Sequence, residues 1–306
     1  MNSDNEYFNM FDYKRVAQLI RNSVIKLSHR FFEKQNFVYV DPPILHESII
    51  NKKNEIYISD FDNKFSLNSS NALYLGAYAS EFKHVYAISP CFRNEKDSIN
   101  HLMEFRMLEV EVIDMNFDEM IEFIINYIKY ILRGVSNEKW IKDYPLLLKR
   151  DILLLEKFDP KKISYEEFVD MIRTESDYTI TEETDLSDID YIVSKYIDSP
   201  IIIVDYPQRI ASWTSKLKSN GSNYAMNLIL PETYGELAEG CERTNDTALL
   251  QYKMDCANIT NLQWYIEAVR NIYASRCGFG MGIDRLIRWI IGSKDIKETV
   301  LFPRVR

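Results

Sequence analysis

The stretch from residue 85 to residue 115, VYAISPCFRNEKDSINHLMEFRMLEVEVIDM, has β-branched and aromatic residues at both ends and a polar segment between them. This pattern predicts two strands joined by a loop. The second strand alternates, so Phe105, Glu109 and Glu111 share one face. Because burying unpaired charge is costly, that face is not an ordinary core face. It predicts a ligand-facing surface or, as an alternative, the solvated face of an antiparallel sheet.

The loop between these strands adds ionisable side chains. Arg93 and Glu95 lie at its start and His101 at its end. An arginine with carboxylates nearby suits a phosphate-bearing ligand, because the guanidinium fork matches phosphate oxygens. The two strands and their loop therefore predict a pocket for a phosphorylated molecule.

Two segments resemble motifs of the class II aminoacyl-tRNA synthetases. FRNE followed by HLMEF, at residues 92–95 and 101–105, resembles motif 2, and GFGMGIDRLIRWIIGSKDIKETVLFPR, at residues 278–304, resembles motif 3. The likeness is to the asparaginyl and aspartyl subgroup. It implies an α+β fold with one antiparallel sheet flanked by helices, in a single catalytic domain over residues 1–306.

The regions around these motifs fit the same plan. Helical periodicity from Tyr13 to Lys34 predicts an amphipathic helix, and a short strand over residues 37–40 ends at two prolines. This unit resembles motif 1, which forms the homodimer interface in the family; a helix packed on its own domain is the alternative. Residues 118–200 predict a mostly helical insertion.

The resemblance implies that the phosphorylated ligand is ATP with Mg²⁺. Arg93 would contact the α-phosphate and Arg285 the γ-phosphate, as the two catalytic residues. Glu236 would hold the metal, since hard cations prefer carboxylate oxygen. Its family partner, an aspartate, is Asn227 here, which removes one negative ligand and is expected to weaken the metal site. The other implied ATP contacts are Glu95, His101, Phe105 stacked on adenine, and Gly282.

The implied amino-acid pocket departs from the family in part. Ser70 matches, but Ala72 stands where the family has a glutamine and Leu75 where the aspartyl enzymes have a lysine. Arg276 stands where the aspartyl group often has a histidine. These changes fall where amino-acid identity is read, so the substrate could differ from aspartate and asparagine.

Three further residues complete the implied pocket. Arg243 matches the arginine that contacts the side chain of aspartate or asparagine; the alternative is a surface arginine paired with Glu239 or Glu242. Glu109 and Glu111 would receive an ammonium group or a further metal ion.

Composition limits the classes of function. The net charge of −9 and the lack of a basic block disfavour extensive nucleic-acid binding, so tRNA is a disfavoured partner. The four cysteines form no C-x-x-C pair, and no zinc site is indicated. No apolar run reaches membrane-spanning length and the N-terminus does not resemble a signal peptide, which predicts a cytoplasmic protein without membrane association.

These observations predict an ATP-dependent, AMP-forming ligase. It would form an aminoacyl-adenylate from aspartate, asparagine or a related amino acid, and ammonia or another amine would then displace AMP, as in asparagine synthetases. Few residues precede motif 1, where the family has an anticodon-binding domain, which favours amide formation over tRNA charging. The alternatives are a minimal asparaginyl-tRNA synthetase-like enzyme that charges tRNA or another carrier, and a non-catalytic paralogue acting as a sensor or subunit.

Overall fold

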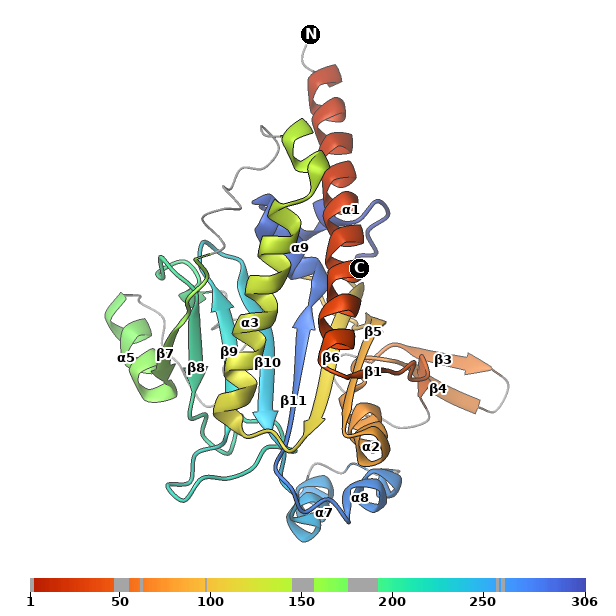
Figure 1. Ribbon diagram of the computed structural model, residues 1–306, viewed down its shortest axis with the longest axis vertical. Helices are drawn as coiled ribbons and strands as arrows, with labels where there is room; N and C mark the ends of the chain where they lie inside the picture. Colours follow the sequence, from red (N-terminus) through yellow and green to blue (C-terminus); the bar gives the residue numbers. More distant parts are fainter. Residues whose placement is uncertain are drawn as a thin grey trace.

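A computed structural model of the chain describes residues 3–46, 55–60, 63–96, 98–144, 157–175, 192–256, 259 and 262–306. An eight-stranded sheet forms its centre, in the order β1-β5-β6-β11-β10-β9-β8-β7 (Figure 1). Neighbouring strands are antiparallel except for the two edge pairs, β1 with β5 and β7 with β8. The antiparallel sheet predicted from the sequence is confirmed. The strands are β1 (Val38–Tyr39), β5 (His84–Phe92), β6 (Glu104–Ile113), β7 (Lys161–Ser164), β8 (Ile201–Val204), β9 (Ala225–Leu230), β10 (Gly235–Glu242) and β11 (Arg276–Gly282).

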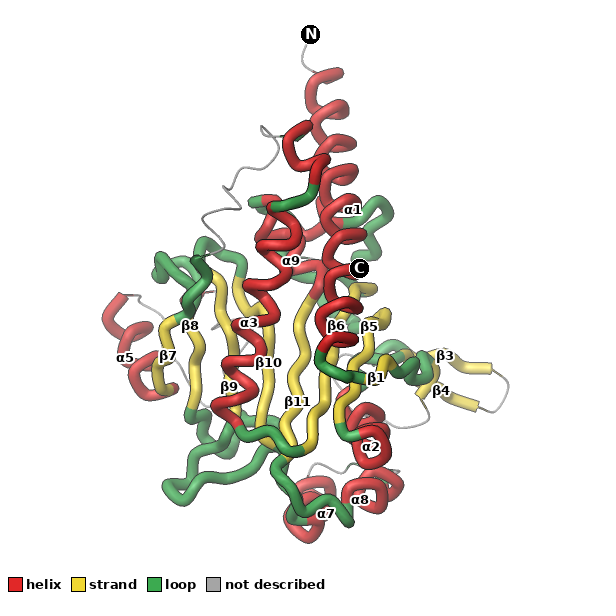
Figure 2. Tube along the Cα trace, viewed as in Figure 1, coloured by secondary structure: helices red, strands yellow, loops and turns green. Residues whose placement is uncertain are grey.

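Figure 2 shows α1 and α3 running across the sheet, α2, α7 and α8 gathered at one end of it, and α5 beside the β7 edge. One face packs against α1, α3 and α9 in the largest apolar cluster. The other face meets α2 and α8 at one end and α5 near the β7 edge. A small sheet, β2-β4-β3, lies beside α2. The helices are α1 (Ser3–Lys34), α2 (Ala72–Phe82), α3 (Phe117–Ser136), α5 (Tyr165–Glu175), α7 (Thr247–Cys256), α8 (Gln263–Val269) and α9 (Ile283–Ile291), with 3-10 turns η1 (Lys139–Asp143) and η2 (Ile296–Thr299), and the small sheet consists of β2 (Leu45–His46), β3 (Tyr57–Asp60) and β4 (Asn63–Leu67).

The N-terminal helix is longer than its apolar periodicity predicts. The prediction began at Tyr13, whereas α1 begins at Ser3. The preceding residues are mostly polar, which hides a helix from a search for an apolar stripe. The predicted strand over residues 37–40 is confirmed as β1, at the edge of the main sheet.

The stretch 118–200 contains sheet as well as helix. Its first helix, α3, begins with a capping box in which Asn116 and Glu119 exchange hydrogen bonds, and nine of its side chains are buried. Strand β7 was not predicted, because KKIS carries a single apolar residue and pairs only with the distant β8. Residues 145–156 and 176–191 of this stretch lie outside the described residues.

Among the described residues, no helix has the length and apolar character that crossing a membrane requires.

Candidate active site

A cavity of about 510 Å³ opens on the sheet face that α1 and α3 do not cover. Twelve predicted site residues line it together, although they come from segments far apart in the sequence. Two predicted residues, Glu111 and Arg276, do not line it and lie buried beside it. The twelve are Ser70, Ala72, Arg93, Glu95, His101, Phe105, Glu109, Asn227, Glu236, Arg243, Gly282 and Arg285.

Strand register explains why these residues meet. One row crosses four strands through Asn227, Glu239, Gly280 and Glu109, and the next row contains Gly278 opposite Glu111. Paired residues on neighbouring strands point to the same face. The glycines of β11 therefore leave space between carboxylates on both sides, and this space is the floor of the cavity.

Arg93 leaves the end of β5 and points toward the ring of Phe105, with its guanidinium carbon 5.3 Å from the ring centroid. It donates to the backbone oxygen of Ser69 at 3.3 Å, and its Nη1 lies 3.9 Å from Glu95 Oε1. The other carboxylate oxygen of Glu95 is 3.5 Å from Nε2 of His101. These contacts hold a cation, an aromatic ring and an acid side by side, which suits a nucleotide's phosphate and base.

A second arginine enters the cavity from the first turn of α9. Arg285 Nη1 donates to the backbone oxygen of Glu236 at 2.7 Å and lies 3.7 Å from Glu236 Oε1. Asn227 Nδ2 donates to Glu236 Oε2 at 2.9 Å. Carboxylate and amide oxygens are hard donors, so these residues fit Mg²⁺, with one negative charge where the resemblance implies two.

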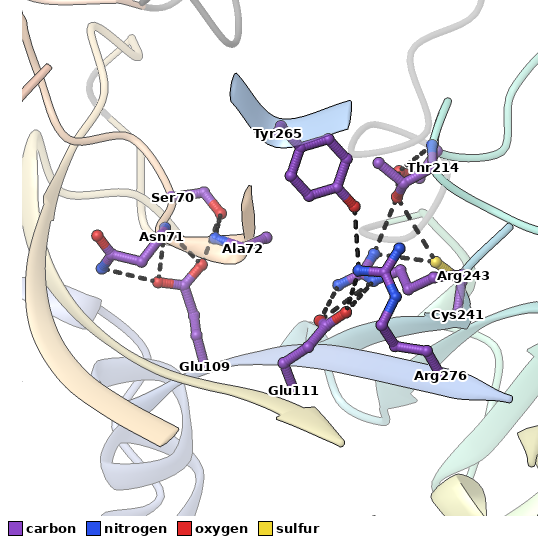
Figure 3. A network of polar contacts seen from close by, with 11 residues as sticks. Ser70, Asn71, Ala72, Glu109, Glu111, Thr214, Cys241, Arg243, Tyr265 and Arg276 are labelled. Atoms are coloured by element: carbon purple, nitrogen blue, oxygen red, sulfur yellow. Dashed lines mark hydrogen bonds and ion pairs between the residues drawn. The ribbon is translucent and has the colours of Figure 1, made fainter. Parts of the chain in front are cut away.

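Glu109 is tied to the start of α2 (Figure 3). It accepts hydrogen bonds from Ser70 Oγ at 2.6 Å and from the backbone nitrogen and Nδ2 of Asn71 at 2.9 and 3.1 Å. Ser70 Oγ also accepts from the backbone nitrogen of Ala72 at 3.2 Å. The carboxylate thus fixes the entry to α2 at the wall of the cavity, and only its remaining acceptor capacity could receive the predicted ammonium group.

Glu111 lies between two arginines (Figure 3). Its Oε2 is 3.1 Å from Nη2 of Arg243 and its Oε1 is 3.0 Å from Nη1 of Arg276. This arrangement differs from the predicted one, in which Glu111 receives an ammonium group or a metal ion. Both carboxylate oxygens of Glu111 already bind guanidinium groups. The alternative of a surface Arg243 paired with Glu239 or Glu242 is wrong, since the residue is 9% exposed and pairs with Glu111.

Glu111, Arg243 and Arg276 form a cluster, called the Glu111 cluster below, that carries more positive than negative charge. Arg243 also donates to Thr214 Oγ1 and Cys241 Sγ at 3.0 Å, but burial raises the pKa of the Cys241 thiol, which stays neutral. Arg276 is fully buried, and within the described residues its Nε and Nη2 atoms make no hydrogen bond. Two guanidinium groups therefore share one carboxylate at this end of the cavity.

The family model for class II tRNA synthetases (D, K and N) matches residues 4–306. The chain belongs to this family. The resemblance first seen in motifs 2 and 3 is thereby confirmed, and it extends over nearly the whole sequence.

Solved structures of synthetases share this fold. Asparaginyl-tRNA synthetase from Pyrococcus horikoshii, complexed with asparaginyl-adenylate, has a TM-score of 0.88 and 24% identity, over 96% of this chain and 69% of that chain. The enzyme of the same name from Entamoeba histolytica, also with asparaginyl-adenylate, has a TM-score of 0.82 and 17% identity, over 96% and 68%. Aspartyl tRNA synthetase from Entamoeba histolytica has a TM-score of 0.70 and 21% identity, over 94% and 58%. At these identities the likeness shows the fold alone.

Glu239, an acid that lines the cavity of this synthetase domain, was not predicted as a site residue. Strict alternation along β10 would place Glu236 and Glu239 on opposite faces, but a β-bulge interrupts the register between Glu236 and Ala238. Leu237 and Ala238 consequently both join the core under α1 and α3, while Glu236 and Glu239 both line the cavity. The low polarity of the protein around Glu239 and the negative charge of Glu236 raise the pKa of the Glu239 carboxyl group. The side chain is exposed to solvent in the cavity, and water offsets part of this rise.

Replacing Gly278 with alanine is expected to lower the free energy of unfolding by about 1–3 kcal/mol through overpacking. A Cβ atom there would lie 1.9 Å from Oε2 of Glu111 and 2.3 Å from Nη2 of Arg243, so this ion pair would have to separate. Urea unfolding followed by circular dichroism measures the loss. Gly280→Ala on the same strand is the matched control, because its nearest neighbour is the flexible end of Met107 at 3.0 Å. Equal losses for the two variants would contradict the prediction.

Proposed function

We propose that this chain activates an amino acid with ATP and transfers the activated acyl group to ammonia or another amine. A carboxylate oxygen of the amino acid would attack the α-phosphorus of ATP, and the bond to pyrophosphate would break. The nitrogen of the amine would then attack the acyl carbon of the adenylate, lose a proton and release AMP. The observation that carries this proposal is the single cavity that joins Arg93, Arg285 and Glu236 to Arg243 and Glu109.

The roles of the side chains follow from charge and position. Arg93, from the segment that resembles motif 2, and Arg285, from the segment that resembles motif 3, would bind phosphate oxygens. They would stabilise the charge that develops on these oxygens. Ser70, held on Glu109 at 2.6 Å, would orient the amino acid at the wall of the cavity. Bound Mg²⁺ would neutralise phosphate charge, with Glu236 and Asn227 as the residues placed to hold it.

We further propose a substrate with two carboxylates, such as aspartate. The Glu111 cluster contains two guanidinium groups and one carboxylate, so a second anion at Arg243 would balance its charge. One carboxylate of the substrate would bind there, which leaves the other to react with ATP. A neutral amide such as that of asparagine would not supply this charge.

The test is amino-acid-dependent pyrophosphate release from Mg·ATP, measured with each standard amino acid, with and without ammonium. We expect release with a dicarboxylic amino acid and an amide product when ammonium is present. Release without amide would overturn amide formation and would direct the search to other acceptors, with tRNA first, where binding should weaken steeply with salt. Pyrophosphate release with none of the amino acids would contradict the proposal as a whole.

We also propose a homodimer formed through α1 and β1, the unit that resembles motif 1. The β1 residues Val38 and Tyr39 are 39% and 45% exposed, which leaves apolar surface for a second copy.

A further inference from the structure

Glu239 lies on the floor of the cavity, between the two ends at which the proposed reactants would bind. Glu236, which pairs with Arg285, precedes it on β10, and Arg243 comes directly after the strand. The positive charges of Arg93 and Arg243 both act electrostatically on the Glu239 carboxylate. Glu239 is therefore placed near the point where the carboxyl group of the substrate would join the α-phosphorus.

The other acids that line the cavity already have partners. Each of them is bound to an arginine, to a histidine, or to hydroxyl and amide donors. These acids are Glu95, Glu109, Glu236 and Asp284. In the part of the chain that the structure describes, Glu239 makes no hydrogen bond or ion pair, and its side chain is open to the cavity. Glu239 is thus the lining acid best able to accept a cationic ligand.

Binding of the proposed reactants would remove positive charge around Glu239. Arg93 would bind a phosphate and Arg243 a carboxylate of the substrate, so the Glu239 carboxylate would lie between two anions. A carboxylate in such surroundings is stabilised by a cationic hydrogen-bond donor. The amine that displaces AMP supplies one, because amines are mostly protonated at neutral pH.

We propose that Glu239 binds the cationic nitrogen of the acceptor, ammonium or a primary ammonium group, and holds it beside the acyl carbon of the adenylate. The proposal rests on the proposed function, which supplies the acceptor. The bound nitrogen would give one proton to water and attack the acyl carbon. As the C–N bond forms, the bond from the acyl carbon to the AMP oxygen breaks, AMP leaves with the electron pair, and a second proton passes to water.

The experiment measures binding of methylammonium, as a probe for the acceptor, by saturation-transfer difference NMR of its methyl protons. The full chain is loaded with Mg²⁺ and α,β-methylene-ATP, which cannot release pyrophosphate, and with either succinate or aspartate. Succinate lacks the ammonium group of aspartate, so the two arms separate the acceptor's nitrogen from the substrate's own. The natural chain is expected to bind methylammonium in both arms, and Glu239→Gln to weaken that binding about tenfold.

Glu267→Gln is the matched control, because this exposed acid on α8 does not line the cavity. Its affinity for methylammonium should equal that of the natural chain. Thermal unfolding checks that each variant is folded, and Glu239→Ala replaces the glutamine variant if the latter fails to fold. Glu239→Asp keeps the charge on a shorter side chain, so its affinity should lie between those of the natural chain and Glu239→Gln.

The kinetic counterpart is the KM for ammonium in amide formation. In Glu239→Gln it should rise at least about fivefold more than the KM for the amino acid, which a general structural defect would not produce.

Three results would overturn the proposal. The natural chain could fail to bind methylammonium in the succinate arm, or Glu239→Gln could bind it as tightly as the natural chain does. Binding with succinate that aspartate abolishes would place the substrate's own ammonium group on Glu239. Because the NMR measurement involves no turnover, these results stay distinguishable from failure of the proposed ligase activity, which pyrophosphate release reports.

Discussion

Replacing Arg93 with alanine is expected to lower the rate of amino-acid-dependent pyrophosphate release by about 10²- to 10³-fold, the typical cost of removing one preorganised donor to developing charge. The guanidinium group is held over Phe105 at 5.3 Å and by the backbone oxygen of Ser69. The Arg93 side chain therefore loses little conformational entropy when phosphate binds. Steady-state rates at saturating ATP, compared with the natural chain, measure the loss.

Arg93→Lys separates charge from geometry. Lysine keeps the positive charge but loses the planar fork, so its rate should lie between those of the natural chain and the alanine variant. Arg173→Ala, on the exposed surface of α5, is the control and should leave the rate unchanged. If a folded Arg93→Ala protein retained most of its activity, Arg93 would not contact the reacting phosphate.

Much of the site could be predicted because each of its motifs is local in the sequence, although the motifs lie far apart from one another. Alternation in one strand places Phe105, Glu109 and Glu111 on one face, and the structure shows that face turned toward the cavity. The resemblance to motifs 2 and 3 adds Arg93 and Arg285, which lie far apart in the sequence. Several strands of the sheet could be predicted from their β-branched and aromatic residues, whereas β7 could not.

The remaining features depend on contacts that no local pattern encodes. Arg243 and Arg276 reach Glu111 across 132 and 165 residues, so neither ion pair could be inferred from spacing. The bulge in β10 inverts the face of Glu239, because one extra residue shifts every later side chain to the other side. A prediction from strict alternation would therefore have assigned this acid to the core face.

Replacing Glu111 with glutamine is expected to lower the free energy of unfolding by about 3–5 kcal/mol, since it leaves two buried guanidinium groups without a counter-charge. Glu111 is fully buried and Arg276 has no exposed surface. The amide also brings N–H donors toward guanidinium donors, which cannot pair with them. Urea unfolding at neutral pH measures the change as a lower midpoint with an unaltered slope.

The comparison variants test the physical cause of this loss. Glu104→Gln, at an exposed position on the same strand, should change the free energy of unfolding by no more than about 0.5 kcal/mol. Adding Arg276→Met to Glu111→Gln should recover part of the lost stability, because methionine fills the space and removes one unpaired buried charge. If the double variant were less stable than Glu111→Gln alone, the contact of the Arg276 guanidinium group with the Tyr265 ring would be the larger contribution. A loss below about 1 kcal/mol in the single variant would mean that water or another group compensates the arginines, contrary to the charge balance at Glu111.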